Sequence, residues 1–204
     1  MINRLTCLVI AACLAVAPAF AQSADSEAEA FIDALVIELR TNAERDGEGS
    51  TSVRATLEQN LATGAIGRFL IRGEIDKAAT EAQRLRYEEL FPLYIAAAYA
   101  EEIGQLASRE IRISGSLERK PGDLIVRSAL FDAKGAKRAN IDWRVRLTGD
   151  GEYKLFDVLV ERISPLITRR QSFSQMFADD GLDGLLAHMQ ETIDAGITIE
   201  TDDE

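Results

Sequence analysis

The residue types that most often carry out catalysis are scarce in this chain. It has 204 residues with one histidine and two cysteines, Cys7 and Cys13. His188 follows Leu185 and Leu186 late in a segment with helical spacing, which is typical of a surface or helix-end histidine. Both cysteines lie in the apolar N-terminal segment, so no second residue is available to complete a zinc site or a histidine-activated nucleophile. The sequence therefore argues against both kinds of site.

Three carboxylates near the C-terminus, Asp179, Asp180 and Asp183, lie close together in sequence. A calcium-binding loop places its oxygen ligands at alternating positions, and this spacing lacks that alternation. Asp179 or Asp180 suits the N-cap of a following helix, because a carboxylate there accepts hydrogen bonds from free backbone N–H groups. We therefore expect no metal at this cluster.

Asp157 is the acid with the most chemical potential, because it lies between Phe156 and Val158 in an otherwise apolar strand. A charge in such a strand is costly unless it is hydrogen-bonded. One hypothesis is a general base whose pKa is raised by an apolar pocket, as an isomerase or lyase would use. The other is a structural carboxylate that pairs with an arginine such as Arg144 or Arg146. We adopt the structural interpretation and keep the enzyme as an alternative.

The segment around Asp157 predicts two antiparallel strands with a turn between them. Residues 149–151, Gly-Asp-Gly, turn the chain, and the return strand 153–160 is apolar on both faces. Residues 141–147 have the period of a strand with one buried and one charged face. The apolar members of that strand are Ile141, Trp143, Val145 and Leu147.

Two more strands are predicted before this pair, at 110–117 and 123–132. Residues 120–122, Lys-Pro-Gly, join them with a strong turn signal, and Lys134-Gly135 marks the next turn. The four strands predict an antiparallel meander.

Helical spacing precedes the strands and follows them. A first helix should begin near Ser26, followed by two short helices at 52–61 and 65–75. The first helix has one apolar stripe, made of Phe31, Ile32, Leu35, Val36 and Leu39. Helices first, sheet second and helices last predict an α+β protein rather than alternating βαβ units.

The longest predicted helix begins at Thr80, where Thr80 and Gln83 have the spacing of a capping box. It should end at Gly104, a natural C-cap. Pro92 falls inside it and should kink or divide it. A bent helix over a twisted sheet leaves room for a cavity.

The N-terminus predicts export. Arg4 precedes an apolar run from Leu5 to Val16, and Ala19-Phe20-Ala21 forms an A-x-A cleavage site, so residues 1–21 are interpreted as a signal peptide cleaved after Ala21. Both cysteines lie inside it, and lipid attachment at Cys13 is not expected because the apolar run before it is very short. The mature chain then has no disulfide and relies on its core.

The mature chain is expected to form a single α+β domain, residues 22–197, with an acidic tail at 198–204. The removed segment has one arginine and no acid, so the net charge changes from −11 to −12. Such an acidic protein would be repelled by the phosphates of nucleic acid. We therefore exclude nucleic acid as a partner. Separately, we expect the protein to be a monomer.

A set of motifs resembles one known family. They are a WRVR-type strand, a short turn with glycine, a YKLFDVLVE strand, then ISPLITRRQSF and GLDGLL, together with the helix that begins at Gln83. This order resembles the MlaC/toluene-tolerance family of periplasmic phospholipid-binding components of an ABC-type lipid transport system, over about 61–187. The chain departs from the family pattern in three places. Arg162 replaces a glycine, Tyr153 replaces a tryptophan, and Pro165 follows Ser164.

The resemblance implies an NTF2-like scaffold, with helices packed on a curved four-stranded antiparallel sheet and an apolar cavity between them. It also implies a periplasmic shuttle that carries glycerophospholipids between the outer membrane and an inner-membrane ABC transporter, and so maintains outer-membrane lipid asymmetry. An outer-membrane lipoprotein would be a further partner. We expect no enzyme activity and no cofactor, the phospholipid being cargo. Another hydrophobe, a quinone or hopanoid, is an alternative ligand.

The expected cavity lies between the long helix, the concave face of the sheet and the segment 163–177. Arg169 and Arg170 are candidates for contact with the lipid headgroup. The residues expected to contact the lipid chains are Phe69, Phe91, Tyr94, Ile95, Tyr99, Trp143, Val145, Phe156, Val158, Ile163, Leu166, Ile167, Phe173 and Phe177.

Overall fold

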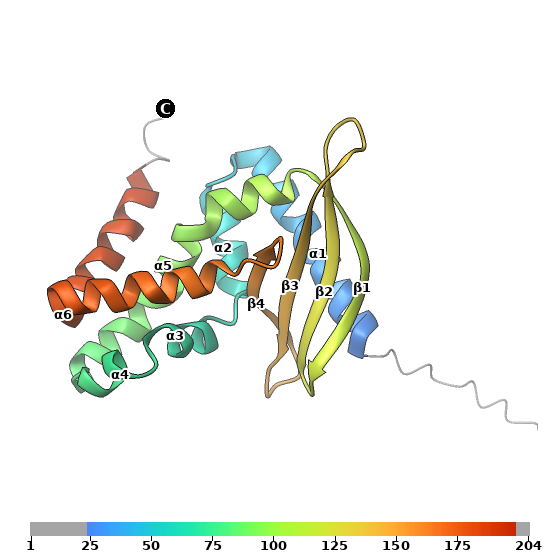
Figure 1. Ribbon diagram of the computed structural model, residues 1–204. Coiled ribbons are helices and arrows are strands. Elements are labelled where there is room, and N and C mark those ends of the chain that lie inside the picture. The colour runs from blue at the N-terminus through green and yellow to red at the C-terminus, as the bar shows by residue number, and fades with distance from the viewer. Residues whose placement is uncertain (1–23, 199–204) are drawn as a thin grey trace, which may run out of the picture.

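The computed structural model of the protein describes residues 24–198, shown in Figure 1. The predicted signal peptide and nearly all of the predicted acidic tail lie outside the described residues. Within them, four strands form one antiparallel sheet in the order β1-β2-β3-β4. The strands are β1 (Glu110–Lys120), β2 (Asp123–Phe131), β3 (Lys137–Leu147) and β4 (Tyr153–Val160). The predicted meander is therefore confirmed.

Helices lie before and after the sheet in the chain, so the α+β prediction is also confirmed. The elements are α1 (Ala24–Asp46), α2 (Thr51–Asn60), α3 (Thr63–Ile71), α4 (Glu74–Ala78), α5 (Glu81–Ala107) and α6 (Pro165–Thr198). The predicted single helix at 65–75 is wrong, because Gly73, with φ 116°, separates α3 from α4. Gly181, with φ 69°, likewise breaks α6 into two parts. Glycine adopts such angles without the steric cost that other residues meet.

Helix α5 includes Pro92 without being divided there. It differs from its prediction at the C-terminal end, because it continues past Gly104 to Ala107. Gly104 is needed for close packing rather than for ending the helix, because a Cβ there would lie 2.3 Å from the carbonyl oxygen of Glu48. The N-terminus is as predicted, since Thr80 and Gln83 form the full capping box.

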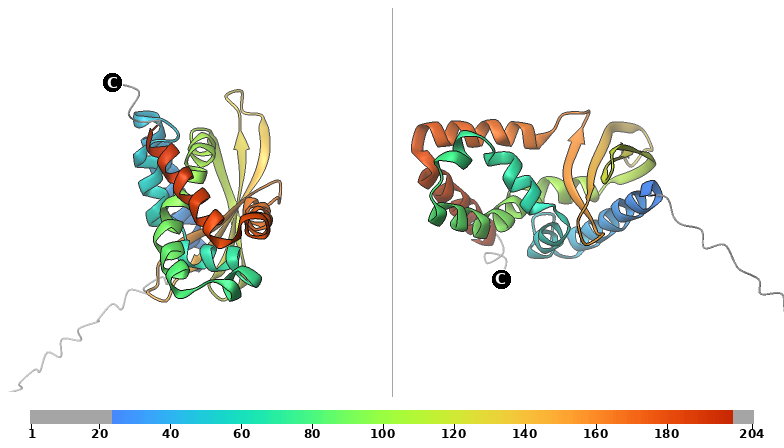
Figure 2. Two further views of the ribbon diagram at one scale, coloured as in Figure 1. Left: turned by 90° about the vertical axis from the view of Figure 1, so that its left-hand side faces the viewer. Right: turned by 90° about the horizontal axis from the view of Figure 1, so that it is seen from below.

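The two faces of the sheet have different surroundings. Helix α1 packs against β1 and β2 on the face that carries Trp143 and Val145, both fully buried. The other face is open to solvent at Leu117 and Arg127. Figures 1 and 2 show the remaining helices gathered beyond the edge strand β4, and α2, α3 and α6 all contact that strand. These remaining helices therefore meet the sheet at β4, whereas α1 meets it at β1 and β2.

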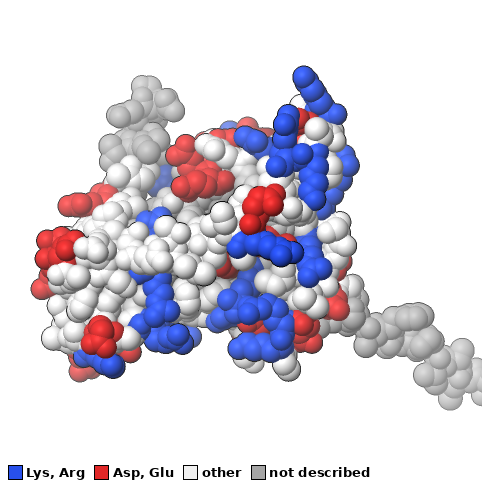
Figure 3. Space-filling model, in the orientation of Figure 1, with Lys and Arg blue, Asp and Glu red and all other residues white. Residues whose placement is uncertain are grey.

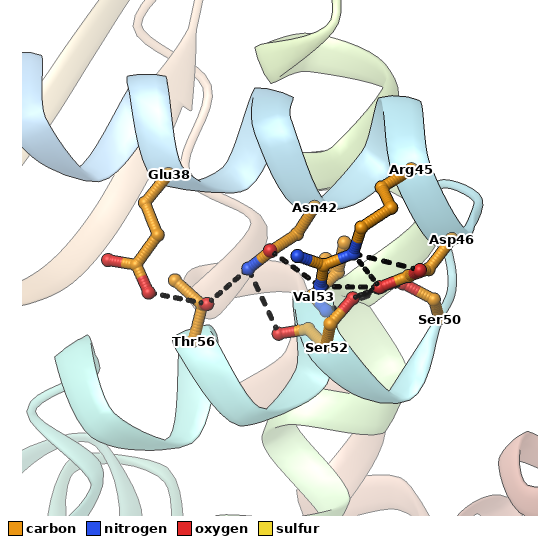
Figure 4. A network of polar contacts seen from close by, with 8 residues as sticks. All are labelled: Glu38, Asn42, Arg45, Asp46, Ser50, Ser52, Val53 and Thr56. Carbon is orange, nitrogen blue, oxygen red and sulfur yellow. Dashed lines mark hydrogen bonds and ion pairs between the residues drawn. The ribbon is translucent and has the colours of Figure 1, made fainter.

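A row of polar contacts, drawn in Figure 4, joins α1 to α2. Asn42 Nδ2 donates to Thr56 Oγ1 at 2.9 Å, and that hydroxyl donates to Glu38 Oε1 at 2.9 Å. Near the connecting loop, Ser52 Oγ donates to Asp46 Oδ2 at 2.7 Å. Each such bond contributes roughly 0.5–1.5 kcal/mol. Together they fix the position of α2 along α1.

Candidate functional site

An apolar pocket of about 220 Å³ lies where α5, the α2–α3 segment, β4 and the start of α6 meet. Its two charged lining residues, Asp157 and Glu102, are both acidic. The full lining is Leu61, Ile66, Ile95, Tyr99, Glu102, Ile103, Leu106, Leu155, Phe156, Asp157, Val158, Val160, Pro165 and Leu166. A cavity of this kind suits a hydrophobic ligand.

A β-bulge in β4 explains how one strand contributes so much of this lining. Arg144 pairs with Asp157 and Val145 pairs with Leu155, so Phe156 is an extra residue in the register. As a result Leu155, Phe156 and Asp157 are buried in succession, although a regular strand alternates its faces. The backbone N–H of Ala62 donates to the carbonyl oxygen of Leu155 at 2.8 Å, which ties the α2–α3 segment to the same point.

Asp157 links β4 to the beginning of α6. Ser164 Oγ donates to its Oδ2 at 2.5 Å, and the backbone N–H of Ile167 donates to Ser164 Oγ at 3.3 Å, in the manner of an N-cap. The expected arginine pair does not form, because Arg144 makes a bidentate contact with Asp123 at 2.9 and 2.7 Å. Burial raises the pKa of Asp157, and the hydrogen bonds from Ser164 and the backbone oppose that effect only in part.

This raised pKa predicts how Asp157→Asn changes stability with pH. The folded protein takes up a proton at Asp157 more readily than the unfolded chain, whose pKa is near the ordinary 3.8. The free energy of unfolding of the wild type therefore rises as the pH falls toward and through the raised pKa. The asparagine variant has no carboxyl group at this position and lacks that contribution. We expect the free energy of unfolding of the wild type, minus that of the variant, to increase between pH 7 and pH 4 in denaturant titrations.

Asp123→Asn is the control, because the stability that this carboxylate contributes should change with pH in the opposite direction. Burial acts to raise the pKa of Asp123, but the hydrogen bond and charge of Arg144, with Arg146 and Arg119, outweigh it and hold the pKa below 3.8. The stability that Asp123 contributes is present above 3.8 and is lost as the pH falls through the lowered pKa. If the free energy of unfolding of the wild type minus that of Asp157→Asn instead decreased on acidification, the raised pKa of Asp157 would be contradicted.

The start of α6 is also held against α5 by Arg169. Its Nη1 donates to the hydroxyl of Tyr94 at 3.0 Å, and its guanidinium lies 5.2 Å from the ring centre of Tyr99. Burial raises the pKa of Tyr99, so its hydroxyl stays protonated. Arg170 donates to the carbonyl oxygen of Arg72 at 3.1 Å and lies over the ring of Phe69. Both expected headgroup residues are thus engaged within the protein.

The sequence model of the family described as MlaC protein matches residues 25–191. The chain belongs to the MlaC family. Its fold is also that of a phospholipid-binding protein from Ralstonia solanacearum, solved in complex with a phospholipid. The TM-score is 0.66 at 16% identity, over 86% of this chain and 99% of that one. The resemblance seen in the strand and helix motifs is therefore confirmed.

The expected lipid contacts of this MlaC-family chain fall into three groups. Those that line the pocket are Ile95, Tyr99, Phe156, Val158 and Leu166. Those that the structure places away from it in the interior are Tyr94, Phe91, Trp143, Val145, Phe173 and the partly buried Phe177. Those on the open side of the molecule, in or beside a second cavity, are Phe69, Ile163 and Ile167. Trp143 and Val145 do not reach the pocket, although they share a face of the sheet with their β4 partners Val158 and Leu155, which line it.

Ile163 lies outside the pocket, with 69% of its surface exposed. It follows a tight turn in which Val160 and Ile163 exchange backbone hydrogen bonds of 3.1 and 2.9 Å. Glu161 and Arg162, inside the turn, have φ of 49° and 66°. A left-handed backbone costs a non-glycine residue about 1–2 kcal/mol. The position where the family pattern has glycine, at Arg162, is thus one where glycine would relieve strain.

Sequence reasoning missed much of the pocket wall, including Leu61, Ile66, Ile103 and Leu106. Ile103 and Leu106 continue the face of Tyr99 along α5, at helical spacings of four and seven residues. Leu106 lies beyond Gly104, where the helix was expected to end, whereas Ile103 lies within the predicted helix. Leu61 and Ile66 carried no local signal, since only the meeting of the α2–α3 segment with β4 places them at the pocket.

Other site types find no support in residues 24–198. That part of the chain holds no group of three or more histidine, cysteine or acidic residues arranged to bind a metal ion. Asp183 instead accepts a hydrogen bond from Gln83, and Asp179 accepts two from Gln175. In the same residues, no helix combines the length and the apolar character needed to cross a membrane.

Proposed function

We propose that this MlaC-family protein is a periplasmic shuttle that binds glycerophospholipids. The observation that carries the proposal is the apolar pocket between α5, β4 and the start of α6. The related fold from Ralstonia solanacearum, whose structure contains a phospholipid, supports the choice of ligand. The acyl chains would lie against Ile95, Ile103, Leu155 and Leu166.

The energetics of a lipid carrier fit a pocket with little polar machinery. Each buried methylene is worth about 0.8 kcal/mol relative to water, so long acyl chains supply ample free energy. The bilayer supplies the same amount. A carrier therefore needs only to bind the acyl chains about as favourably as the bilayer does, and a dry apolar wall is sufficient for that.

The pocket must widen to accept a phospholipid. Its volume of about 220 Å³ is below the roughly 300–1,000 Å³ of ordinary ligand cavities. Several side chains on its wall, among them Tyr99, Leu106 and Val158, are only partly buried. We expect these residues and the start of α6 to move outward when the chains enter.

The place of the protein in transport rests on the signal peptide and on family membership. An A-x-A site after an apolar N-terminal run directs the chain to the periplasm. There the protein would carry lipid between the outer membrane and an inner-membrane ABC transporter, with an outer-membrane lipoprotein as a further partner. It would do so without chemistry and without a cofactor.

One observation favours a second candidate, an isomerase or lyase. Asp157 is a carboxyl with a raised pKa in an apolar pocket, the arrangement that a proton-abstracting base requires. Its hydrogen bond from Ser164, at the start of α6, favours the structural role instead. Retention of lipid by Asp157→Asn, with a changed pH dependence of stability, would agree with that role.

The test of the function is identification of the cargo. Protein exported and purified without detergent should yield glycerophospholipid when extracted with organic solvent and analysed by mass spectrometry, at up to one molecule per chain. Extract from a periplasmic protein of similar size without such a pocket is the control. Recovery of a quinone or hopanoid, or of no lipid at a level above the control, would contradict a phospholipid shuttle.

A further inference from the structure

A second cavity, of about 610 Å³, lies on the open face of the sheet beside the start of α6. We call it the arginine groove, because Arg119, Arg127, Arg144 and Arg162 line it. Leu117, Ile125, Leu159 and Ile167 give it apolar walls between these cations. Figure 3 shows basic side chains gathered over the strands and largely uncharged surface beside them.

The groove has more positive than negative charge, although the whole chain has a net charge of −11. Its four arginines face two lining aspartates, Asp142 and Asp157. Arg144 and Arg119 share Asp123, which lies next to the groove, at 2.7 and 3.9 Å. Over residues 24–198, neither Arg127 nor Arg162 has a carboxylate within ion-pair distance. These two guanidinium groups are available to an anion.

Arg146 adds to the surplus of cations next to the groove. Its guanidinium lies 3.5 Å from the ring centre of Phe156, and its Nε is buried without a hydrogen-bond partner. Burial, and then the positive charge of Arg144 with that of Arg119 and Arg68, lower its pKa. A negative group in this region would therefore relieve repulsion among the arginines.

The backbone of Arg162 also indicates a function. Its φ of 66° is a left-handed conformation that glycine adopts without steric cost, and the preceding Glu161 shares the strain with φ 49°. Glu161 accepts a hydrogen bond from the backbone N–H of Asn140 at 2.6 Å, which keeps its carboxylate on β3. Strain held in place by its surroundings is common at ligand sites. An arginine at this costly position directs a free cation into the groove.

The groove and the apolar pocket meet across one strand. Phe156 and Asp157 line both cavities, and the hydrogen bond from Ser164 to Asp157 lies at their boundary. The pocket itself repels a phosphate, because its charged lining residues are Asp157 and Glu102. A lipid with its chains in the pocket would therefore favour a position of its phosphate outside, toward the arginines.

We propose that the arginine groove binds the phosphate group of the lipid whose acyl chains occupy the pocket, with Arg127 and Arg162 as its direct contacts. This inference rests on the proposed lipid-binding function. Guanidinium groups donate paired N–H groups to phosphate oxygens, and such charge-assisted bonds are strong. The apolar walls of the groove would contact the glycerol end of the lipid.

The test compares lipids with and without phosphate. Dihexanoylphosphatidylglycerol, dihexanoylglycerol and inorganic phosphate are titrated into the mature, lipid-free protein by calorimetry. We expect Arg162→Gly and Arg127→Gln each to weaken binding of the phospholipid about tenfold, as loss of a charge-assisted bond implies. Binding of dihexanoylglycerol should not change. The melting temperature of Arg162→Gly should be no lower than that of the wild type, because glycine relieves the strain.

Arg86→Gln is the matched control, since Arg86 is an exposed arginine on α5 that contacts Glu89 and Gln190 away from the groove. It should bind both lipids as the wild type does. Full binding of the phospholipid by both groove variants would overturn the inference and leave the proposed function intact. Inorganic phosphate that binds as tightly as the phospholipid would also overturn it, in favour of a free-anion site. Failure of the wild type to bind either lipid would overturn the proposed function itself.

Discussion

Val158→Trp is expected to empty the pocket of lipid while the protein stays folded. Val158 lines the pocket from β4 and is only partly buried, so an indole can enter the cavity without displacing the core. The pocket is small, at about 220 Å³, and excluding as few as two methylenes at about 0.8 kcal/mol each costs about tenfold in affinity. We therefore expect co-purifying phospholipid, measured by mass spectrometry per mole of protein, to fall at least about tenfold.

Two further variants make this result interpretable. Leu106→Trp enters the same pocket from α5, on the opposite wall, and should have the same effect. Leu147→Trp places an indole at the exposed end of β3, outside the pocket, and should retain the full load. Circular dichroism establishes that each variant is folded. Folded Val158→Trp and Leu106→Trp proteins that both keep their lipid would show that the chains lie elsewhere.

Leu35→Glu is expected to unfold the protein. Leu35 is 2% exposed on the apolar stripe of α1, which packs on the sheet. An ionised carboxylate buried there without a partner costs several kcal/mol, which is comparable with the roughly 5–15 kcal/mol that stabilises an ordinary domain. We expect loss of the cooperative thermal transition, followed by circular dichroism.

Ile37→Glu is the control on the same helix. Ile37 lies two residues further along α1 and is 54% exposed, so a glutamate there reaches water. The change should alter the free energy of unfolding by less than about 0.5 kcal/mol, as is usual for surface positions. Equal loss of structure in both variants would mean that α1 tolerates no acidic substitution, and the comparison would then not identify its buried face.

The elements of the fold were predictable because each has a local cause. The capping box of Thr80 and Gln83 fixes the start of α5, and the period of two in β3 identifies the face that α1 covers. Gly104 shows the limit of such reasoning. Its role depends on the approach of Glu48, which is 56 positions earlier in the chain, and no local pattern reports that contact.

The pocket was predictable only in part, for a similar reason. The β-bulge at Phe156 leaves three successive residues of β4 buried, whereas a simple alternation assigns Phe156 and Asp157 to opposite faces. Leu61 reaches the pocket through its pairing with Leu155, a long-range contact. Ile163 was expected among the lipid contacts because it belongs to the segment that follows β4. The left-handed residues Glu161 and Arg162 turn the chain before it.

The polar row between α1 and α2 restricts movement of α2 along α1. Hydrogen bonds such as those of Asn42 and Thr56 keep their strength over only a few tenths of an ångström, so α2 cannot slide without breaking them. Between α5 and the start of α6, the hydrogen bond from Arg169 to Tyr94 is accompanied by apolar contacts, which have no preferred direction. We therefore expect the side of the pocket toward α2 to keep its position, and any widening for a ligand to come from the side formed by the start of α6.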